Sequence, residues 1–181
     1  MANKLHKFTV AEATSKMAQR AIIRVTPTVT ASDAYADGDV LFTATEIPNA
    51  VLESGGCSKL VAAYLVDEDS QGTLVQLVFT EKNTDFGTIH ATANVSYDNA
   101  VAANICGVGV VSADTDTIDI DNFKIHQANA YGTHVNTELA LPFLLQAEDG
   151  STSVYVSGVI ADGTPTFSNA DSLQLIFHID Y

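Results

Sequence analysis

The sequence predicts an all-β protein: a single antiparallel β-sandwich, jelly-roll-like, with an N-terminal arm that contains a short helix. Hydrophobic residues alternate with polar residues at period two along most of the chain, and turn residues separate these runs. Apolar residues make up 46% of the 181 residues and charged residues only 17%, which is below the usual quarter. A helical bundle would need more Lys and Glu on its exposed faces, so the composition favours strands.

The chain divides into a basic arm over residues 1–20 and a β-sandwich domain over residues 21–181. Thr9 and Glu12 have the spacing of a capping box, which predicts a short helix over residues 8–19. The period then changes to two, and residues 21–30 are expected to form a strand. Pro27 cannot donate a ladder hydrogen bond, so this strand should lie at an edge or carry a bulge.

A second strand is expected over residues 40–45, and residues 57–66 and 73–79 read as a hairpin around the polar turn 67–72. The first arm of that hairpin is apolar on both faces, which is typical of a central strand. Residues 96–103 are expected to make one helical turn before a strand over residues 104–111. Gly107 and Gly109 share a face of that strand, where we expect another backbone to approach closely.

Within residues 118–125, the hydrophobic residues fall at even-numbered positions up to Ile120 and at odd-numbered positions from Phe123. A bulge or bend near Asn122 would let both sets face the same side of the sheet. Residues 127–137 lack periodicity and are expected to form an exposed loop. Three further strands are predicted, over residues 139–145, 154–160 and 173–181. About eight or nine short strands with turns between them favour a sandwich or jelly roll.

Charge is divided unevenly along the chain. Residues 1–24 carry +4 and the remainder carries −18, which together give the net charge of −14. An acidic body repels phosphate groups, so we expect no direct binding of nucleic acid. In one interpretation, the excess of acidic residues keeps the protein soluble. In the other, the basic arm docks on an acidic partner, and that partner could be a neighbouring copy of the chain.

Neither a membrane span nor a secretory signal is expected, because no apolar run is long enough and the first twenty residues lack an apolar core. Cys57 and Cys106 are 49 positions apart with no metal-ligand spacing, and two reduced thiols are favoured over a disulfide. The five histidines are scattered, without the paired spacing of a metal site.

The loop 67–72 starts like a calcium loop, but Val78 occupies the position of the bidentate glutamate. Solvated turn acids are therefore favoured over a looser calcium site at Asp67 and Asp69. No nucleophile elbow, phosphate loop or dinucleotide motif is present. We therefore expect no enzyme activity, no catalytic residues and no cofactor.

The order of several pieces resembles a family of structural proteins in tailed-phage virions. A Thr-rich strand at 26–30 leads to the stretch AYADGDV at 34–40, and similar pieces follow at 55–60, 65–67, 77–79, 83–87, 141–143, 163–167 and 171–175. The likeness covers roughly residues 22–181 and leaves the arm outside it. It implies a β-sandwich in the virion, most often a decoration or cement protein of the head, and it implies no catalytic residues. The acidic loop 112–121 and the loop 127–137 are enlarged here.

The resulting expectation is a capsid decoration protein on the virion exterior, made in the host cytoplasm, that bridges major capsid proteins and contacts neighbouring copies of itself. The alternative is a tail, fibre or vertex module that binds a receptor or carbohydrate. The candidate residues for the capsid interface are Lys4, Lys7, Phe8, Val10, Lys16, Met17, Arg20, Ile22 and Arg24.

Overall fold

The structure is a computed structural model that describes residues 19–112, 117–130 and 142–181. The described residues contain ten strands and one short helix. The strands are β1 (Arg20–Val25), β2 (Val40–Ile47), β3 (Cys57–Asp67), β4 (Leu74–Thr80), β5 (Ile105–Val111), β6 (Thr117–Ile120), β7 (Phe123–Ala130), β8 (Phe143–Gln146), β9 (Val154–Asp162) and β10 (Leu173–Asp180), and the helix is α2 (Tyr97–Ala102).

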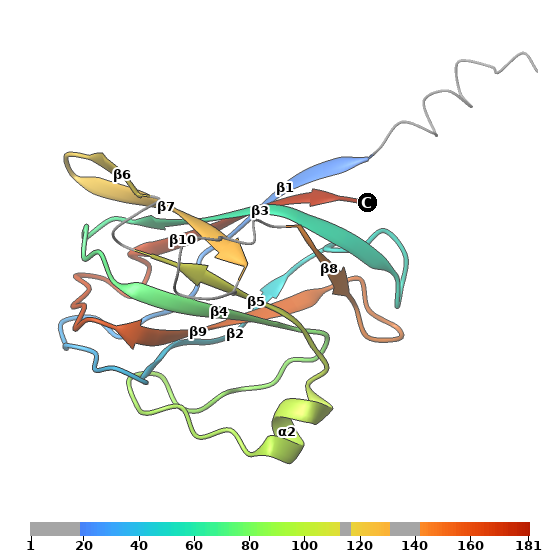
Figure 1. Ribbon diagram of the computed structural model, residues 1–181, viewed down its shortest axis with the longest axis horizontal. Coiled ribbons are helices and arrows are strands. Elements are labelled where there is room, and N and C mark those ends of the chain that lie inside the picture. The colour runs from blue at the N-terminus through green and yellow to red at the C-terminus, as the bar shows by residue number, and fades with distance from the viewer. Residues whose placement is uncertain (1–18, 113–116, 131–141) are drawn as a thin grey trace, which may run out of the picture.

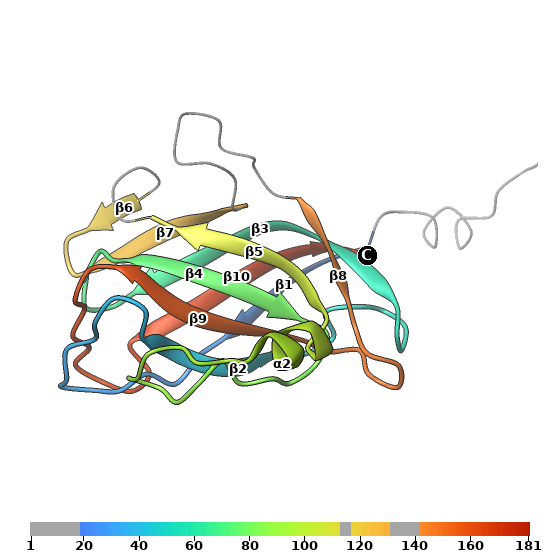
Figure 2. The ribbon, with the colours of Figure 1, turned by 60° about the horizontal axis from the view of Figure 1, so that its bottom comes forward.

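The strands form one continuous sheet in the order β1-β10-β3-β7-β5-β4-β9-β2, with β6 paired to β7 and β8 paired to β3. Every pair of named strands is antiparallel, so the predicted antiparallel β class is confirmed. The sheet curls, with β1, β10 and β3 in one layer and β4, β9 and β2 in the other (Figure 1, Figure 2). β7 joins the layers, since it pairs with β3 and with β5.

The core lies between the two layers of the curled sheet. The ring of Phe79 on β4 lies 5.8 Å from Phe177 on β10 and 5.2 Å from Phe143 on β8, measured between ring centroids. Phe79 and Phe177 are almost fully buried. These aromatic contacts span the space between layers, and the inward-facing residues of each strand alternate with outward-facing ones, as period two requires.

The first strand occupies an edge of the sheet, one of the two alternatives expected from Pro27, but it is shorter than the strand predicted over residues 21–30. β1 pairs with β10 and ends at Val25, two residues before the proline. It begins at Arg20, which is the last residue of the predicted arm. The predicted helix over residues 8–19 falls almost entirely outside the described residues.

The predicted hairpin over residues 57–79 is wrong, although both of its strands exist. β3 pairs with β10, β7 and β8, whereas β4 pairs with β5 and β9. The connection between them crosses from one layer of the curled sheet to the other. Turn residues between two apolar runs indicate a change of direction, but they do not specify which strands pair.

A tight hairpin replaces the bulge or bend expected near Asn122. Ile118 lies opposite Ile125 and Ile120 lies opposite Phe123, with the chain reversing at Asp121, whose φ is 53°. Reversal changes the parity of the hydrophobic positions without any bulge. The loop expected over residues 127–137 is also wrong in its first part, because β7 continues to Ala130 through pairing with β5; residues 131–137 lie outside the described residues.

The remaining elements follow the sequence closely. Ser96 caps α2 by accepting a hydrogen bond from the N–H of Asn99 (3.2 Å), and β5, β9 and β10 occur where they are predicted. β8 begins at Phe143, and residues 139–141 of the predicted strand lie outside the described residues. The close approach expected at Gly107 exists, but the ring of Phe143 makes it rather than another backbone.

Candidate functional site

Three predicted interface residues lie on one face of β1. Arg20, Ile22 and Arg24 alternate along the strand and are exposed, while Ala21, Ile23 and Val25 point inward. Arg20 forms a 2.8 Å ion pair with Asp180 on β10, and Ile22 is 53% exposed. The other six candidates, Lys4, Lys7, Phe8, Val10, Lys16 and Met17, lie outside the described residues.

The outward face of β1 continues across its neighbours. Directly opposite residues of antiparallel strands share a face, so Ile22 lies beside His178 and Arg24 lies beside Ile176. The ring of His178 is 5.4 Å from the ring of Tyr64 on β3. The face therefore extends over three strands with side chains that are only partly buried.

The β6–β7 hairpin extends this face further. Val66 on β3 lies opposite Ile125, which lies opposite Ile118. Ile118 is 62% exposed and Ile120 is 45% exposed. The neighbouring residue on β7, His126, is on the opposite face of the strand and is buried. We call Ile22, Ile176, Tyr64, Val66, Ile125 and Ile118 the outer strip. The outer strip was not predicted from the sequence, in which the change of hydrophobic parity near Asn122 was the one sign of it.

A separate cleft of about 450 Å³ opens where β3, β5 and β8 begin or end. Its lining consists of Cys57, Glu81, Asn104, Ile105, Cys106, Leu144 and Gln146. Glu81 accepts a 2.6 Å hydrogen bond from the side-chain amide of Asn104. Burial raises the pKa of the Cys106 thiol, and a backbone hydrogen bond at Gln146 offsets only part of this rise. A thiol with a raised pKa is a poor nucleophile at neutral pH.

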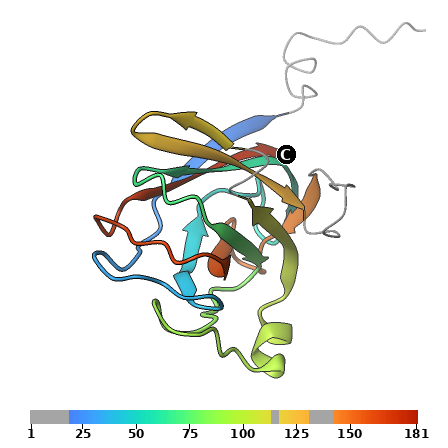
Figure 3. The same cartoon turned by 60° about the vertical axis from the view of Figure 1, so that its left-hand side comes forward.

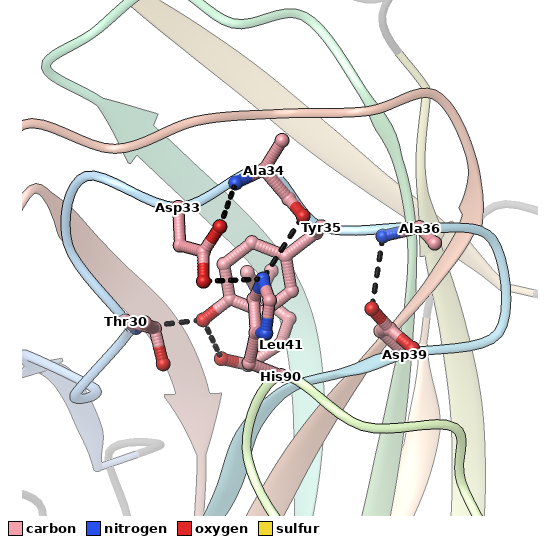
Figure 4. Close-up of polar contacts among 8 residues, drawn as sticks. All are labelled: Thr30, Asp33, Ala34, Tyr35, Ala36, Asp39, Leu41 and His90. Atoms are coloured by element: carbon pink, nitrogen blue, oxygen red, sulfur yellow. Dashed lines mark hydrogen bonds and ion pairs between the residues drawn. The ribbon is translucent and has the colours of Figure 1, made fainter.

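A buried tyrosine connects two long loops (Figure 4). The hydroxyl of Tyr35 accepts from the N–H of Thr30 (2.7 Å) and donates to the carbonyl of Leu41 (3.1 Å). The ring of His90 lies edge-on to Tyr35 at 4.8 Å, and its Nε2 lies 2.9 Å from the carbonyl of Ala34. Because the hydroxyl already has both partners, this cluster holds the loops together and presents no free reactive group.

The acidic turn 67–72 is a structural clamp. The carboxylate of Asp67 accepts from the N–H groups of Asp69 (3.0 Å) and Gln71 (2.7 Å), and Asp69 accepts from the N–H of Ser168 (2.8 Å). Burial raises the pKa of Asp69, but its hydrogen bonds from Ser168 and Ser172 outweigh this and lower it overall. Backbone amides therefore use the oxygens that a calcium ion would need. Within the described ranges, no three His, Cys, Asp or Glu residues gather as a metal site.

Comparisons with protein-family models, with curated proteins and with solved structures return no match. In the described part of the chain, no helix combines the length and apolarity needed to cross a membrane.

Proposed function

We propose that this chain is a structural protein of a tailed-phage virion that decorates the head exterior and bridges major capsid proteins. The proposal includes the two-sheet sandwich that the family resemblance implies. The two facing layers of antiparallel strands are compatible with such a sandwich. It assigns the chain a mechanical role: surface buried between shell proteins stabilises the mature shell against the pressure of packaged DNA. It assigns no catalytic residue and no cofactor.

The observation that carries the proposal is the position of the basic residues. Arg20 and Arg24 are exposed on the edge strand β1, the arm that ends at Arg20 holds three lysines, and residues 25–181 carry −18. An acidic shell surface would repel the body and attract this end of the chain. The docking orientation therefore follows from the charge distribution.

Charge alone supplies little affinity. Each exposed ion pair contributes about 0–1 kcal/mol, and salt screens it. The free energy of binding must come largely from apolar residues that become buried, for which Phe8, Val10 and Met17 in the arm and Ile22 on β1 are available. Charge then sets the orientation and the rate of association.

The test is binding to purified shells that lack the protein. A chain without residues 1–18 keeps β1 intact, so it should retain the strand signal of the full chain in circular dichroism, but it should fail to bind. Replacing Lys4, Lys7, Lys16 and Arg20 with Gln should weaken binding less, and mostly at low salt. Replacing Lys59 and Lys82 with Gln is the control for charge removal on the body. Unchanged binding by the truncated chain would refute the role of the arm.

The cleft beside β8 favours a second candidate, a receptor- or carbohydrate-binding module. Glu81, Asn104 and Gln146 present a carboxylate and two side-chain amides to a concave site. Sugar hydroxyls bind such groups, but carbohydrate sites usually add an aromatic platform, and the lining found among the described residues contains none. A glycan-binding screen with Asn104→Ala and Gln146→Ala as matched variants distinguishes the two functions.

A further inference from the structure

The two cysteines of the chain line the same cleft, although 49 positions separate them in the sequence. Cys57 is the first residue of β3, and Cys106 is the second residue of β5. These strands do not pair with each other, because β7 lies between them in the order of the sheet. The fold therefore brings the only two thiols of the chain to one place, and both are free.

Gln146 on β8 is the common neighbour of the two cysteines. It is the register partner of Cys57, and directly opposite Cα atoms of antiparallel strands lie about 4.5–5.5 Å apart. Its carbonyl oxygen lies 3.6 Å from Sγ of Cys106. Figure 3 shows β8 (orange) beside β5 (olive), which continues from α2. Burial raises the pKa of the Cys106 thiol most, and the charges of Glu81 and Cys57 raise it further, which places both groups near that sulfur.

The surroundings of the cleft allow the two thiols to approach each other. A disulfide needs its sulfurs about 2 Å apart and its Cα atoms within about 7 Å, so the edges of the cleft have to move together. Cys57 follows Gly55 and Gly56 at the start of its strand, where backbone opens at low cost. Ile105 and Leu144 in the lining are 47% and 64% exposed, so closing the cleft also removes apolar surface from water.

We propose that Cys57 and Cys106 form a disulfide across the cleft when a two-electron oxidant such as hydrogen peroxide is present. Cys57 has the exposed thiol, whose thiolate attacks the peroxide to give a sulfenic acid and water. The thiolate of Cys106 then attacks the sulfenic sulfur, the sulfur–oxygen bond breaks, and the leaving hydroxide takes up a proton to become water. The two thiols lose two electrons and two protons, and the peroxide becomes two molecules of water.

The disulfide ties β3 to β5, and thereby links the two layers of the curled sheet. It closes a loop of about 50 residues, which restricts the unfolded chain and raises the melting temperature by about 5–15 °C. Oxidation thus changes the stability of the protein without requiring a change of fold. This inference goes beyond the proposed function, because it needs only this chain and an oxidant.

The test compares the full chain in its reduced form with the same chain after treatment with hydrogen peroxide, at low protein concentration. The oxidised chain should have no free thiols, run as a single chain on a non-reducing denaturing gel, and yield a peptide pair that joins Cys57 to Cys106. Its melting temperature should be higher by about 5–15 °C, and dithiothreitol should reverse the rise.

Serine variants provide the controls. Cys57→Ser and Cys106→Ser each leave one thiol, and their combination leaves none. The substitutions change one atom, so all three variants should keep the circular dichroism of the reduced wild type. None of them should gain thermal stability on treatment with peroxide. The double variant also reports any effect of peroxide on the rest of the chain, which the other measurements subtract.

Three outcomes overturn the proposal. In the first, both thiols stay free, or each is oxidised without a peptide pair that joins them. In the second, the disulfide forms between chains, which would assign Cys57 to a contact between copies. In the third, the two cysteines join only in urea, or their disulfide fails to raise the melting temperature, which would mean that the fold holds the sulfurs apart. A peptide pair from the folded chain, with a reversible rise in melting temperature that the serine variants lack, supports the proposal.

Discussion

Phe143 of β8 lies over Gly107 of β5 so closely that a Cβ at position 107 would come 2.7 Å from two ring atoms. The same ring contacts Phe79 in the core. The absence of a side chain at position 107 thus lets β8 pack an aromatic residue against β5, and the short strand β8 depends on that packing as well as on its pairing with β3.

Gly107→Ala should therefore destabilise the protein by about 1–3 kcal/mol, the usual cost of forcing extra atoms into a packed core. Urea unfolding measures it. Phe143→Leu should also lower the free energy of unfolding. The double variant should lose less than the sum of the two single losses, because the smaller leucine side chain relieves the clash with the Cβ introduced at position 107. Strict additivity would show that the ring does not enforce glycine at position 107.

Tyr35→Phe should lower the free energy of unfolding by about 1–3 kcal/mol, because it leaves the N–H of Thr30 and the carbonyl of Leu41 without a buried partner. Tyr97→Phe also removes a tyrosine hydroxyl, but from a highly exposed side chain, and should not measurably change the free energy of unfolding. Burial raises the pKa of Tyr35 above 10.0, so its contribution to stability is present below pH 10 and declines as pH rises above that value. Equal effects of the two substitutions would contradict this role of Tyr35.

Burial lowers the pKa of His126 below 6.5, and the nearby carboxylate of Asp67 offsets only part of this. The unfolded chain then takes up a proton at a higher pH than the folded chain does. The free energy of unfolding should accordingly fall as pH decreases from 6.5 towards the folded pKa, and stay level above 6.5. Urea unfolding between about pH 7.5 and about pH 5 should show this slope, and His126→Gln should reduce it. An identical slope in the variant would assign the effect to other groups.

Removing divalent metal should not change the melting temperature, because backbone amides use the oxygens of Asp67. Thermal unfolding with EDTA and with added calcium measures this directly. A shift of more than a few degrees in either direction would mean that Asp67 or Asp69 binds calcium despite these hydrogen bonds.

Period-two patterning predicted most strands because it is a local property of each segment. It found β9 and β10, and it gave an edge position as one of two alternatives for the first strand, which ends before Pro27. It could not predict pairing: β3 and β4 are consecutive along the chain, yet their partners come from elsewhere in it. Pairing depends on how the whole sheet curls, which neither turn residues nor alternation encode.

The candidate site shows the same limit. Arg20, Ile22 and Arg24 could be placed on one face of β1 from alternation alone. The extension of that face to Tyr64, Val66 and Ile118 required the register between β1, β10, β3, β7 and β6. A one-residue change in any of these registers would turn the affected side chains to the core.

Under the proposed function this chain is part of a phage particle, so its copy number in purified particles tests the central claim most directly. Quantitative mass spectrometry against the major capsid protein gives that number. A decoration protein should be present in hundreds of copies, in a fixed ratio to the capsid protein. A dozen copies or fewer would indicate a tail or vertex component, and absence from the particle would contradict a structural role in the virion.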